Sequence, residues 1–269
     1  MKIVKLIFFL IFIVGKSQSQ ELFVFTEPAS NMPAKSLGIR GSNWLMFEET
    51  SNSINYHFIP ELMWGANKKL MLHVEGFLSN RNQTFSLEGG GIYLKYRFFS
   101  RDDVFKHFRM AAFGRVSANN GDIHQEEIEI NGHNTGYEGG LIATQLLHKL
   151  ALSITASYEQ ALDNFNNNKF PKNYSNNALN YSFSVGRLIL PKVYTSYKQV
   201  NMNLMVELLG QTQLQNGKTF IDIAPSIQFI LNSQLRIDIA YKQQLYSDIL
   251  RSAPNGILFR LEYLLFNVF

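Results

Sequence analysis

Strict alternation of apolar and polar side chains is the feature that most constrains how this chain of 269 residues can fold. The segment 234–244 reads QLRIDIAYKQQ. The apolar residues Leu235, Ile237, Ile239 and Tyr241 alternate in it with a mostly polar set, Arg236, Asp238, Ala240 and Lys242. Because successive side chains of a β-strand point to opposite faces, this segment predicts a strand with one apolar and one polar face. Residues 54–64, 150–158 and 220–229 repeat the pattern.

The number and length of these segments indicate which kind of β-protein they form. About twelve recur, centred near residues 42, 59, 74, 92, 111, 142, 155, 184, 205, 225, 239 and 262. Each is about 10–14 residues long, whereas strands of soluble proteins are usually nearer five or six and a tilted membrane strand needs about 9–11. A soluble sandwich would alternate too, but these lengths favour an all-β fold, a single transmembrane antiparallel up-and-down β-barrel of about 12 strands.

The connections between these segments also alternate in length. The predicted short turns are 66–68, 100–103, around His148, 191–197 and 232–233. The predicted long loops are 118–135, 161–177 and 247–255. Short periplasmic turns and longer extracellular loops are the rule for outer-membrane barrels, and an even number of strands returns the C-terminus to the periplasm.

The N-terminal residues predict an exported protein. Lys2 and Lys5 precede an apolar run over 6–14, and Ser17 and Ser19 fit a signal-peptidase site, so residues 1–19 are expected to be a signal peptide. The formal charge of +4 is mostly supplied by three lysines of this region, and the rest of the chain carries 22 basic against 21 acidic residues. The expected location is the cell outer membrane, reached through the inner membrane, and no nucleic-acid partner is expected.

The composition fits a membrane barrel and excludes several classes of site. The chain has no cysteine, which excludes disulfides, thiolate metal sites, a cysteine nucleophile and a lipid anchor. No apolar run after the signal peptide approaches 18 residues, so no transmembrane helix is predicted. The chain has 22 Phe, 12 Tyr and only 17% charged residues, against about 25% in ordinary soluble domains. Many aromatic residues and few charges are what a barrel in lipid requires.

The C-terminal segment GILFRLEYLLFNVF predicts a final strand that ends on an aromatic residue. Tyr263, Leu265 and Phe269 lie on its apolar face and resemble the insertion signal that the barrel assembly machinery recognises, so that machinery and outer-membrane lipid are expected partners. Apolar residues also occupy the other face after Glu262, at Leu264, Phe266 and Val268. They predict a periplasmic end of the lumen that is packed rather than wet.

The segment ELFVFTEPASNMPAKSLGIR, residues 21–40, resembles the opening of a group of Bacteroidota outer-membrane β-barrel proteins described as transporters or porin-like proteins. The resemblance implies the location and the fold and provides no active site. Residues 27–33 are turn-forming by their own chemistry. The expected organisation is a signal peptide over 1–19, a periplasmic lead-in or short plug over 20–36, and a transmembrane barrel over 37–269.

The polar faces of the predicted strands would line the lumen with charge. The predicted inward residues are Arg40, Glu61, His73, Glu75, Lys95, Arg97, His107, Arg109, Arg115, Glu138, Glu159, Glu207, Asp222, Arg236, Asp238, Lys242, Arg260 and Glu262. They would either select solutes in a wet channel or pair across a packed polar core. We favour a narrow or partly occluded pore for small polar or charged solutes; the alternative is a closed barrel that acts as a surface-binding or assembly partner through its loops.

Histidines provide the remaining candidate sites. If the 66–68 turn pairs Gly65 with Lys69, Glu61 lies opposite His73, which predicts an internal hydrogen-bonded pair and, less favoured, a weak metal or proton site. The histidines of the loop 118–135 lie beside acidic residues, and we expect this loop to be solvated; these residues are His124, Glu126, Glu127, Glu129 and His133. The least favoured alternative is a rim hydrolase that uses His124 or His133 with Asp122. No Gly-x-Ser-x-Gly motif occurs, and no Gly-Lys-Ser/Thr follows the glycines at 89–91 and 139–140, so neither catalysis nor a cofactor is expected.

Overall fold

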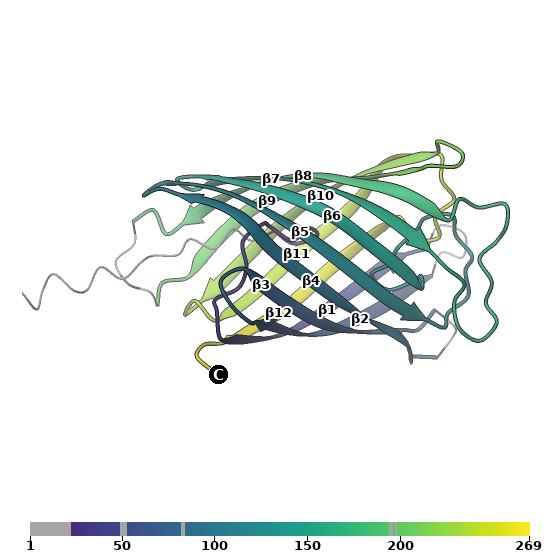
Figure 1. Ribbon diagram of the computed structural model, residues 1–269, viewed down its shortest axis with the longest axis horizontal. Coiled ribbons are helices and arrows are strands. Elements are labelled where there is room, and N and C mark those ends of the chain that lie inside the picture. The colour runs from purple at the N-terminus through teal and green to yellow at the C-terminus, as the bar shows by residue number, and fades with distance from the viewer. Residues whose placement is uncertain (1–22, 49–52, 82–83, 194–195, 197) are drawn as a thin grey trace, which may run out of the picture.

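Twelve antiparallel strands close into a barrel in the computed structural model of the protein (Figure 1). The structure describes residues 23–48, 53–81, 84–193, 196 and 198–269, so the predicted signal peptide lies outside the described residues. Each strand pairs with the next along the chain, and β1 pairs with β12. The pairing of β1 with β12 gives hydrogen-bond partners to the backbone N–H and C=O groups that the edge strands of an open sheet would leave unpaired. The predicted all-β up-and-down barrel of about twelve strands is confirmed.

The strand bounds follow the alternating segments closely. They are β1 Ser36–Phe47, β2 Ile54–Gly65, β3 Leu70–Ser79, β4 Ser86–Asp102, β5 Lys106–Asn119, β6 Gly136–Leu147, β7 Leu150–Ala161, β8 Asn177–Leu190, β9 Asn201–Gln213, β10 Thr219–Leu231, β11 Leu235–Ser247 and β12 Asn255–Leu265. The longest is β4, with 17 residues, which exceeds the predicted length because its pairing with β5 continues past a bulge between Arg97 and Phe99. A bulge lets a strand bend without ending its ladder.

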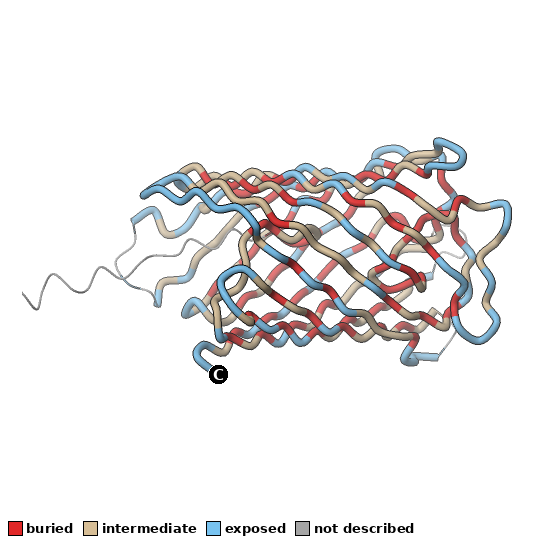
Figure 2. The backbone as a smooth tube through the Cα atoms, in the orientation of Figure 1, coloured by how far each residue is buried: buried red, intermediate tan, exposed pale blue. Residues whose placement is uncertain are grey.

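Side chains alternate between the lumen and the outer face along the strands, as Figure 2 shows by the change between buried and exposed residues. On β10, for example, Asp222 and Ala224 are buried whereas Ile221 is 37% exposed. The apolar residue therefore faces outward and the polar one inward, which is the reverse of a soluble protein. A barrel in lipid requires this inversion, because lipid contacts only its outer wall.

The outer wall carries an apolar band that runs around all twelve strands. A large apolar side chain that is at least 37% exposed occurs on each strand, in order Ile39, Leu62, Val74, Ile92, Val116, Leu141, Ile154, Phe183, Leu204, Ile221, Ile239 and Phe259. Exposed aromatic residues lie near the two ends of the strands, among them Trp64, Tyr96 and Tyr263 at one end and Tyr137, Tyr181 and Tyr246 at the other. Aromatic girdles of this kind mark the two interfaces of a bilayer. Among the described residues no helix is long and apolar enough to cross a membrane.

The connections at the end where the C-terminus lies are short except for residues 191–200, and those at the opposite end are mostly longer (Figure 1). At the first end the strands are joined by residues 66–69, 103–105, 148–149, 191–200 and 232–234. At the other end the connections are 48–53, 80–85, 120–135, 162–176, 214–218 and 248–254. His148, Asn232 and Ser233 adopt positive φ angles of 52–58°, which a tight strand-to-strand turn requires.

The last strand ends at Leu265, earlier than the sequence pattern predicts. Asn267 has a φ angle of 56°, which breaks the alternation, and Phe266 and Val268 are 38% and 44% exposed. Only Leu264, 6% exposed, packs into the lumen as predicted. The expectation that Phe266 and Val268 also fill the periplasmic end was therefore wrong.

Candidate functional site

The charged residues predicted to face the lumen lie on the inner side of the wall at different depths. Those that are buried are Arg40, Glu61, His73, Glu75, Lys95, Glu159, Glu207, Asp222, Arg236, Asp238, Lys242, Arg260 and Glu262. Those that are half-buried are Arg97, His107, Arg109, Arg115 and Glu138. Charges of both signs therefore surround the lumen, and they are held by contacts with the wall itself and with two other segments of the chain.

Three of the half-buried residues lie at the rim of the barrel rather than deep in the lumen. Arg97 donates a hydrogen bond of 2.7 Å to the Lys68 carbonyl oxygen in the turn between β2 and β3. His107 Nδ1 and Arg109 Nε lie 3.1 Å and 3.0 Å from the Asp102 carboxylate, whose side chain is 46% exposed. Exposed pairs of this kind contribute about 0–1 kcal/mol each. Arg109 also donates a hydrogen bond of 2.8 Å to the Ser30 hydroxyl oxygen, so this rim cluster contacts the segment of the chain that precedes β1.

Residues 23–35, which we call the plug segment, lie inside the barrel and return to the end where the C-terminus lies, where β1 begins (Figure 1). The Glu207 carboxylate of β9 anchors this segment. It accepts hydrogen bonds from the backbone N–H groups of Val24, Phe25 and Thr26 at 2.8, 2.9 and 3.0 Å, and from the Thr26 hydroxyl group at 2.7 Å. Hydrogen bonds to an ionised acceptor are stronger than neutral ones, so this one side chain fixes three consecutive residues.

Basic side chains of the wall bind the carbonyl oxygens of the plug segment. Lys95 Nζ donates to the carbonyl oxygens of Pro28 and Ser30 at 2.7 and 3.0 Å. The guanidinium groups of two arginines bind residues 23 and 24: Arg236 donates to the Phe23 carbonyl oxygen at 2.8 Å, and Arg260 to that of Val24 at 2.6 Å. The wall charges thus supply the hydrogen bonds that the irregular backbone of the plug segment cannot make with itself.

An acidic residue of the plug segment completes the charge balance. The Glu27 carboxylate lies 3.0 Å from Arg40 NH1 and 3.3 Å from Lys95 Nζ. Arg40 also contacts Glu61 at 3.2 Å and Glu262 at 2.8 Å, so it connects the plug segment to β2 and β12. The sequence analysis did not identify Glu27 as a site residue, because it lies outside the alternating segments that located the others.

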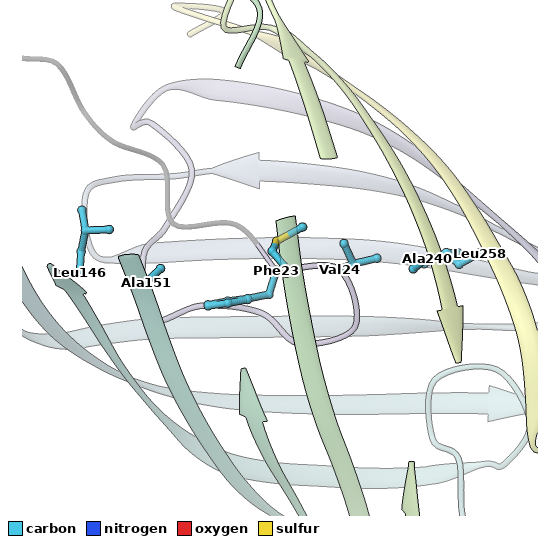
Figure 3. Close-up of a cluster of buried hydrophobic side chains, with 7 residues drawn as sticks. Phe23, Val24, Leu146, Ala151, Ala240 and Leu258 are labelled. Atoms are coloured by element: carbon cyan, nitrogen blue, oxygen red, sulfur yellow. The ribbon is translucent and has the colours of Figure 1, made fainter. Parts of the chain in front are cut away.

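The start of the plug segment also makes an apolar contact with the wall. Phe23 and Val24 lie between Leu146 and Ala151 on one side and Ala240 and Leu258 on the other; these residues belong to one buried apolar cluster (Figure 3). Phe23 is 2% exposed and Val24 is 1% exposed. Burying such side chains stabilises the docked segment by roughly 1.5–3 kcal/mol each. The plug segment is therefore held by apolar packing as well as by charge.

Gly65 of β2 leaves space for the backbone of the plug segment to approach the wall closely. A Cβ atom at Gly65 would overlap the Pro33 carbonyl oxygen and would lie 2.9 Å from Met32 Cγ. Glycine inside a strand is typical of places where another stretch of backbone approaches closely. Any side chain at position 65 would push residues 32–33 away from the wall.

Residues 120–135, which we call the mouth loop, fold over the opposite end of the lumen. Glu127 of this loop is 9% exposed, and its carboxylate accepts hydrogen bonds of 2.8 and 3.0 Å from Arg251 of the connection 248–254. Arg251 binds Asp222 of β10 with two further hydrogen bonds of 2.7 Å. The expectation that this acidic loop is solvated was wrong, because a buried arginine neutralises it.

Further hydrogen bonds fix the mouth loop to the far wall. The Gln211 side chain of β9 accepts from the Ile128 N–H group at 3.1 Å and donates to the Ile128 carbonyl oxygen at 2.8 Å. Gln213 donates to the Glu126 carbonyl oxygen at 2.6 Å, and Lys218 contacts the Glu126 carboxylate at 2.6 Å. The loop therefore spans the mouth from its origin between β5 and β6 to β9 and β10.

A small cavity with both polar and apolar lining residues lies beneath the mouth loop. It has a volume of about 20 Å³, enough for about one water molecule, and is lined in part by His57, Glu88, Glu129, His133 and Lys242. His57 Nδ1 and His133 Nε2 lie 3.4 Å apart. The mouth loop therefore restricts the lumen without filling it completely.

Glu129 should make docking of the mouth loop depend on pH. Burial and then the neighbouring Glu127 carboxylate raise the pKa of Glu129 to about 7 from 4.5. The charged and titratable groups that face it are Glu127 and His133 of the same loop, Lys242 of β11, and Arg81 and Arg251 of other connections. An acid whose pKa is raised on folding stabilises the folded form fully below about pH 4.5, and this contribution is lost as the pH rises through about 7.

We therefore expect limited proteolysis of the mouth loop to become faster between pH 4.5 and 7, and we expect Glu129→Gln to remove this change. The ratio of the two cleavage rates at each pH cancels the pH dependence of the protease itself. A ratio that stays constant across this range would contradict the assignment.

Glu61, His73 and Glu75 form a cluster of acidic and imidazole groups on β2 and β3. Gly65 pairs with Met71 rather than with Lys69, so Glu61 lies opposite Glu75, and the predicted pairing of Glu61 with His73 was wrong. Residues 66–70 separate the paired Gly65 and Met71, which is two residues more than the predicted pairing requires. The His73 Nδ1 atom nevertheless lies 3.4 Å from Glu61 Oε2, by a diagonal contact across the two strands.

The two histidines of the rim-hydrolase alternative lie in different environments. His133 is 6% exposed and lies against His57 and Gln125, whereas His124 is exposed and bonds the Asp122 carbonyl oxygen of its own loop. The rim-hydrolase alternative needs the imidazole of His124 or His133 to act together with the Asp122 carboxylate, whereas His124 contacts only the backbone carbonyl oxygen of Asp122. The contacts of His133 are those of a buried structural residue.

No family model matches the sequence, and no curated protein matches it significantly. Among solved structures, a NanC porin is 12% identical, with 86% of this chain and 98% of that chain covered and a TM-score of 0.48. Pseudomonas aeruginosa OccK11 is 9% identical, with 86% and 95% covered and a TM-score of 0.42. Pseudomonas aeruginosa OprD is 7% identical, with 90% and 99% covered and a TM-score of 0.39.

Proposed function

We propose that the protein is a narrow pore of the outer membrane for small polar or charged solutes, and that the plug segment blocks its lumen at rest. The observation that carries the proposal is that charged side chains of the wall hold the backbone of the plug segment. Glu207, Lys95, Arg236 and Arg260 make these contacts. Water or a polar solute can replace such hydrogen bonds, so the segment can leave and expose a wall that is already charged.

Conductance of the purified barrel in planar lipid bilayers tests this function. We expect brief openings separated by long closed periods, because the open form is a minor population while the plug segment stays docked. A correctly folded barrel that shows no openings, with or without the plug segment, would contradict a pore.

The membrane location rests on the apolar band of the outer wall. Ile154 is 58% exposed near the middle of β7, and we expect Ile154→Arg to destabilise the barrel in lipid vesicles by about 2–4 kcal/mol. Urea unfolding in vesicles measures the change in the free energy of unfolding.

Leu162 provides the matched control, because it is 47% exposed but follows the end of β7. Leu162→Arg should change the free energy of unfolding by about 1 kcal/mol or less, since the cost of a charge falls towards the interface. Equal effects of the two substitutions would argue against a bilayer around β7.

The closed-barrel alternative is favoured by one observation, the burial of both the plug segment and the mouth loop. A barrel that never opens would act through its surface, and the connection 162–176 presents exposed side chains such as Phe165, which is 60% exposed. Pull-down from intact cells with residues 161–177 deleted distinguishes the two functions. Loss of specific partners without a change in conductance would support the alternative, and unchanged partners would count against it.

Insertion is proposed to depend on the C-terminal aromatic residues. Tyr263 is 44% exposed, and the Phe269 ring packs against Trp64 with 6.1 Å between ring centroids. These exposed groups fit recognition by the barrel assembly machinery before the final strand pairs with β1.

A further inference from the structure

A possible metal site lies in the wall, where β2 and β3 place three potential ligands side by side. Glu61 and Glu75 are directly opposite each other, and His73 is two residues from Glu75 on the same face. One possible ligand atom from each of the three residues lies within 4.8 Å of the other two. All three side chains are buried, with exposed fractions of 9%, 1% and 5% for Glu61, His73 and Glu75.

Unpartnered polar atoms in this cluster are the second observation. His73 Nε2 and Glu75 Oε2 are buried and have no hydrogen-bond partner among the described residues. The Tyr93 hydroxyl group, whose ring lies 5.1 Å from that of His73, is buried and unpartnered as well. Buried polar atoms are almost always paired, and two unpaired atoms on potential ligands of one cluster indicate that the cluster binds something further.

The neighbouring arginines hold the two carboxylates only loosely. Arg115 lies 3.4 Å from Glu75 Oε1, and Arg40 lies 3.2 Å from Glu61 Oε2. Strong charge-assisted hydrogen bonds are about 2.7–2.9 Å long, so lone pairs of both carboxylates stay available. A cation would use these lone pairs and an imidazole nitrogen together.

We propose that Glu61, His73 and Glu75 bind a first-row divalent metal ion, with Zn²⁺ as the reference ion. One imidazole nitrogen and two carboxylate oxygens form a borderline-hard ligand set that suits such ions. Zn²⁺ bonds these atoms at about 2.0–2.2 Å in tetrahedral geometry, which places two ligand atoms about 3.3–3.6 Å apart. The candidate ligand atoms lie within 4.8 Å of one another, so binding requires the side chains to close by about 1 Å.

Refolding of the full mature barrel in detergent with Zn²⁺, followed by dialysis and elemental analysis, tests the site. We expect one ion per barrel, and we expect Co²⁺ to give a visible absorption spectrum of a site with nitrogen and oxygen ligands. His73→Gln and Glu75→Gln should each weaken binding at least about tenfold, since even outer partners of a metal ligand contribute that much. A β-sheet circular dichroism spectrum verifies that each variant is folded.

His57 provides the matched control, because it is buried like His73 but lies on β2 outside the cluster. Its Nδ1 atom lies 3.4 Å from His133 Nε2. His57→Gln should leave the stoichiometry and affinity for Zn²⁺ unchanged. Loss of the ion from this variant, or a folded wild-type barrel that retains none, would overturn the proposal.

X-ray absorption spectroscopy of the Zn²⁺-loaded wild-type barrel tests the site without any substitution. The spectrum should show one imidazole among nitrogen and oxygen ligands. Two imidazoles would place the ion between His57 and His133 and would contradict the proposed ligands.

Discussion

Deletion of residues 23–33 is expected to change a barrel that conducts rarely into one that conducts continuously. If the plug segment is docked in about 99% of molecules, its removal raises the mean current about a hundredfold. The deletion removes Glu27 and exposes Glu207, Lys95, Arg236 and Arg260 to water. Single-channel recording in planar bilayers measures both the open time and the size of the current.

A single substitution tests the same idea in a full-length barrel. Glu207→Ala leaves the N–H groups of Val24, Phe25 and Thr26 without their acceptor. Hydrogen bonds to charged groups contribute about 1.5–3 kcal/mol each, so the loss of three weakens docking by at least about 4.5 kcal/mol and raises an open fraction of about 1% nearly a hundredfold, to its limit. The number of openings, rather than their size, should therefore increase.

Glu138→Ala is the control for the loss of a wall carboxylate. Glu138 contacts Arg115 and Ser157 rather than the plug segment. This variant should open as rarely as the wild type. Equal currents from Glu207→Ala, Glu138→Ala and the wild type, with no increase after the deletion, would show that the plug segment does not control the lumen.

The sequence predicted the strands well because alternation is a local property of each strand. It requires only that neighbouring residues face opposite sides, as Leu235 and Arg236 do. The register between two neighbouring strands is not a local property, because the length and shape of the turn that joins them determine it. Glu61 therefore faces Glu75 instead of His73, and the alternation of both strands is the same in either case.

The contacts that close the lumen could not be read from the sequence, because they join residues far apart in the chain. Glu207 binds Thr26 across 181 positions, and Arg251 binds Glu127 across 124. The turn-forming residues 27–33 allowed either a plug or a flexible lead-in. Only the closed barrel brings Glu207, Lys95 and Arg260 to the same level around that segment.

Substitution of Arg251 by alanine is expected to release the mouth loop. Arg251 has a side chain that is 1% exposed, and its guanidinium group lies between Glu127 and Asp222 and 3.8 Å from the centre of the Phe220 ring. Its removal leaves two buried carboxylates unpaired, which costs about 3–5 kcal/mol. The mouth loop should therefore become cleavable by protease about a hundred to several thousand times faster, at about 1.4 kcal/mol per factor of ten.

Lys218 is the control for this prediction, because its pair with Glu126 is also short but its side chain is 38% exposed. Lys218→Ala should cost about 0–1 kcal/mol and change cleavage less than about tenfold. Arg251→Lys keeps the charge but cannot bind both carboxylates with two hydrogen bonds each, so its cleavage rate should lie between those of the wild type and Arg251→Ala. Equal rates for Arg251→Ala and Lys218→Ala would contradict the assigned role.

The plug segment and the mouth loop obstruct the same lumen in series, so their effects on conductance should not be equal. The plug segment contacts strands around the wall, from Lys95 of β4 to Arg260 of β12, whereas the mouth loop leaves a cavity beneath it. Arg251→Ala alone should therefore change the current little, because the plug segment still limits it. Combined with deletion of residues 23–33, it should give larger currents than the deletion alone. A full opening by Arg251→Ala alone would make the mouth loop, rather than the plug segment, the principal barrier.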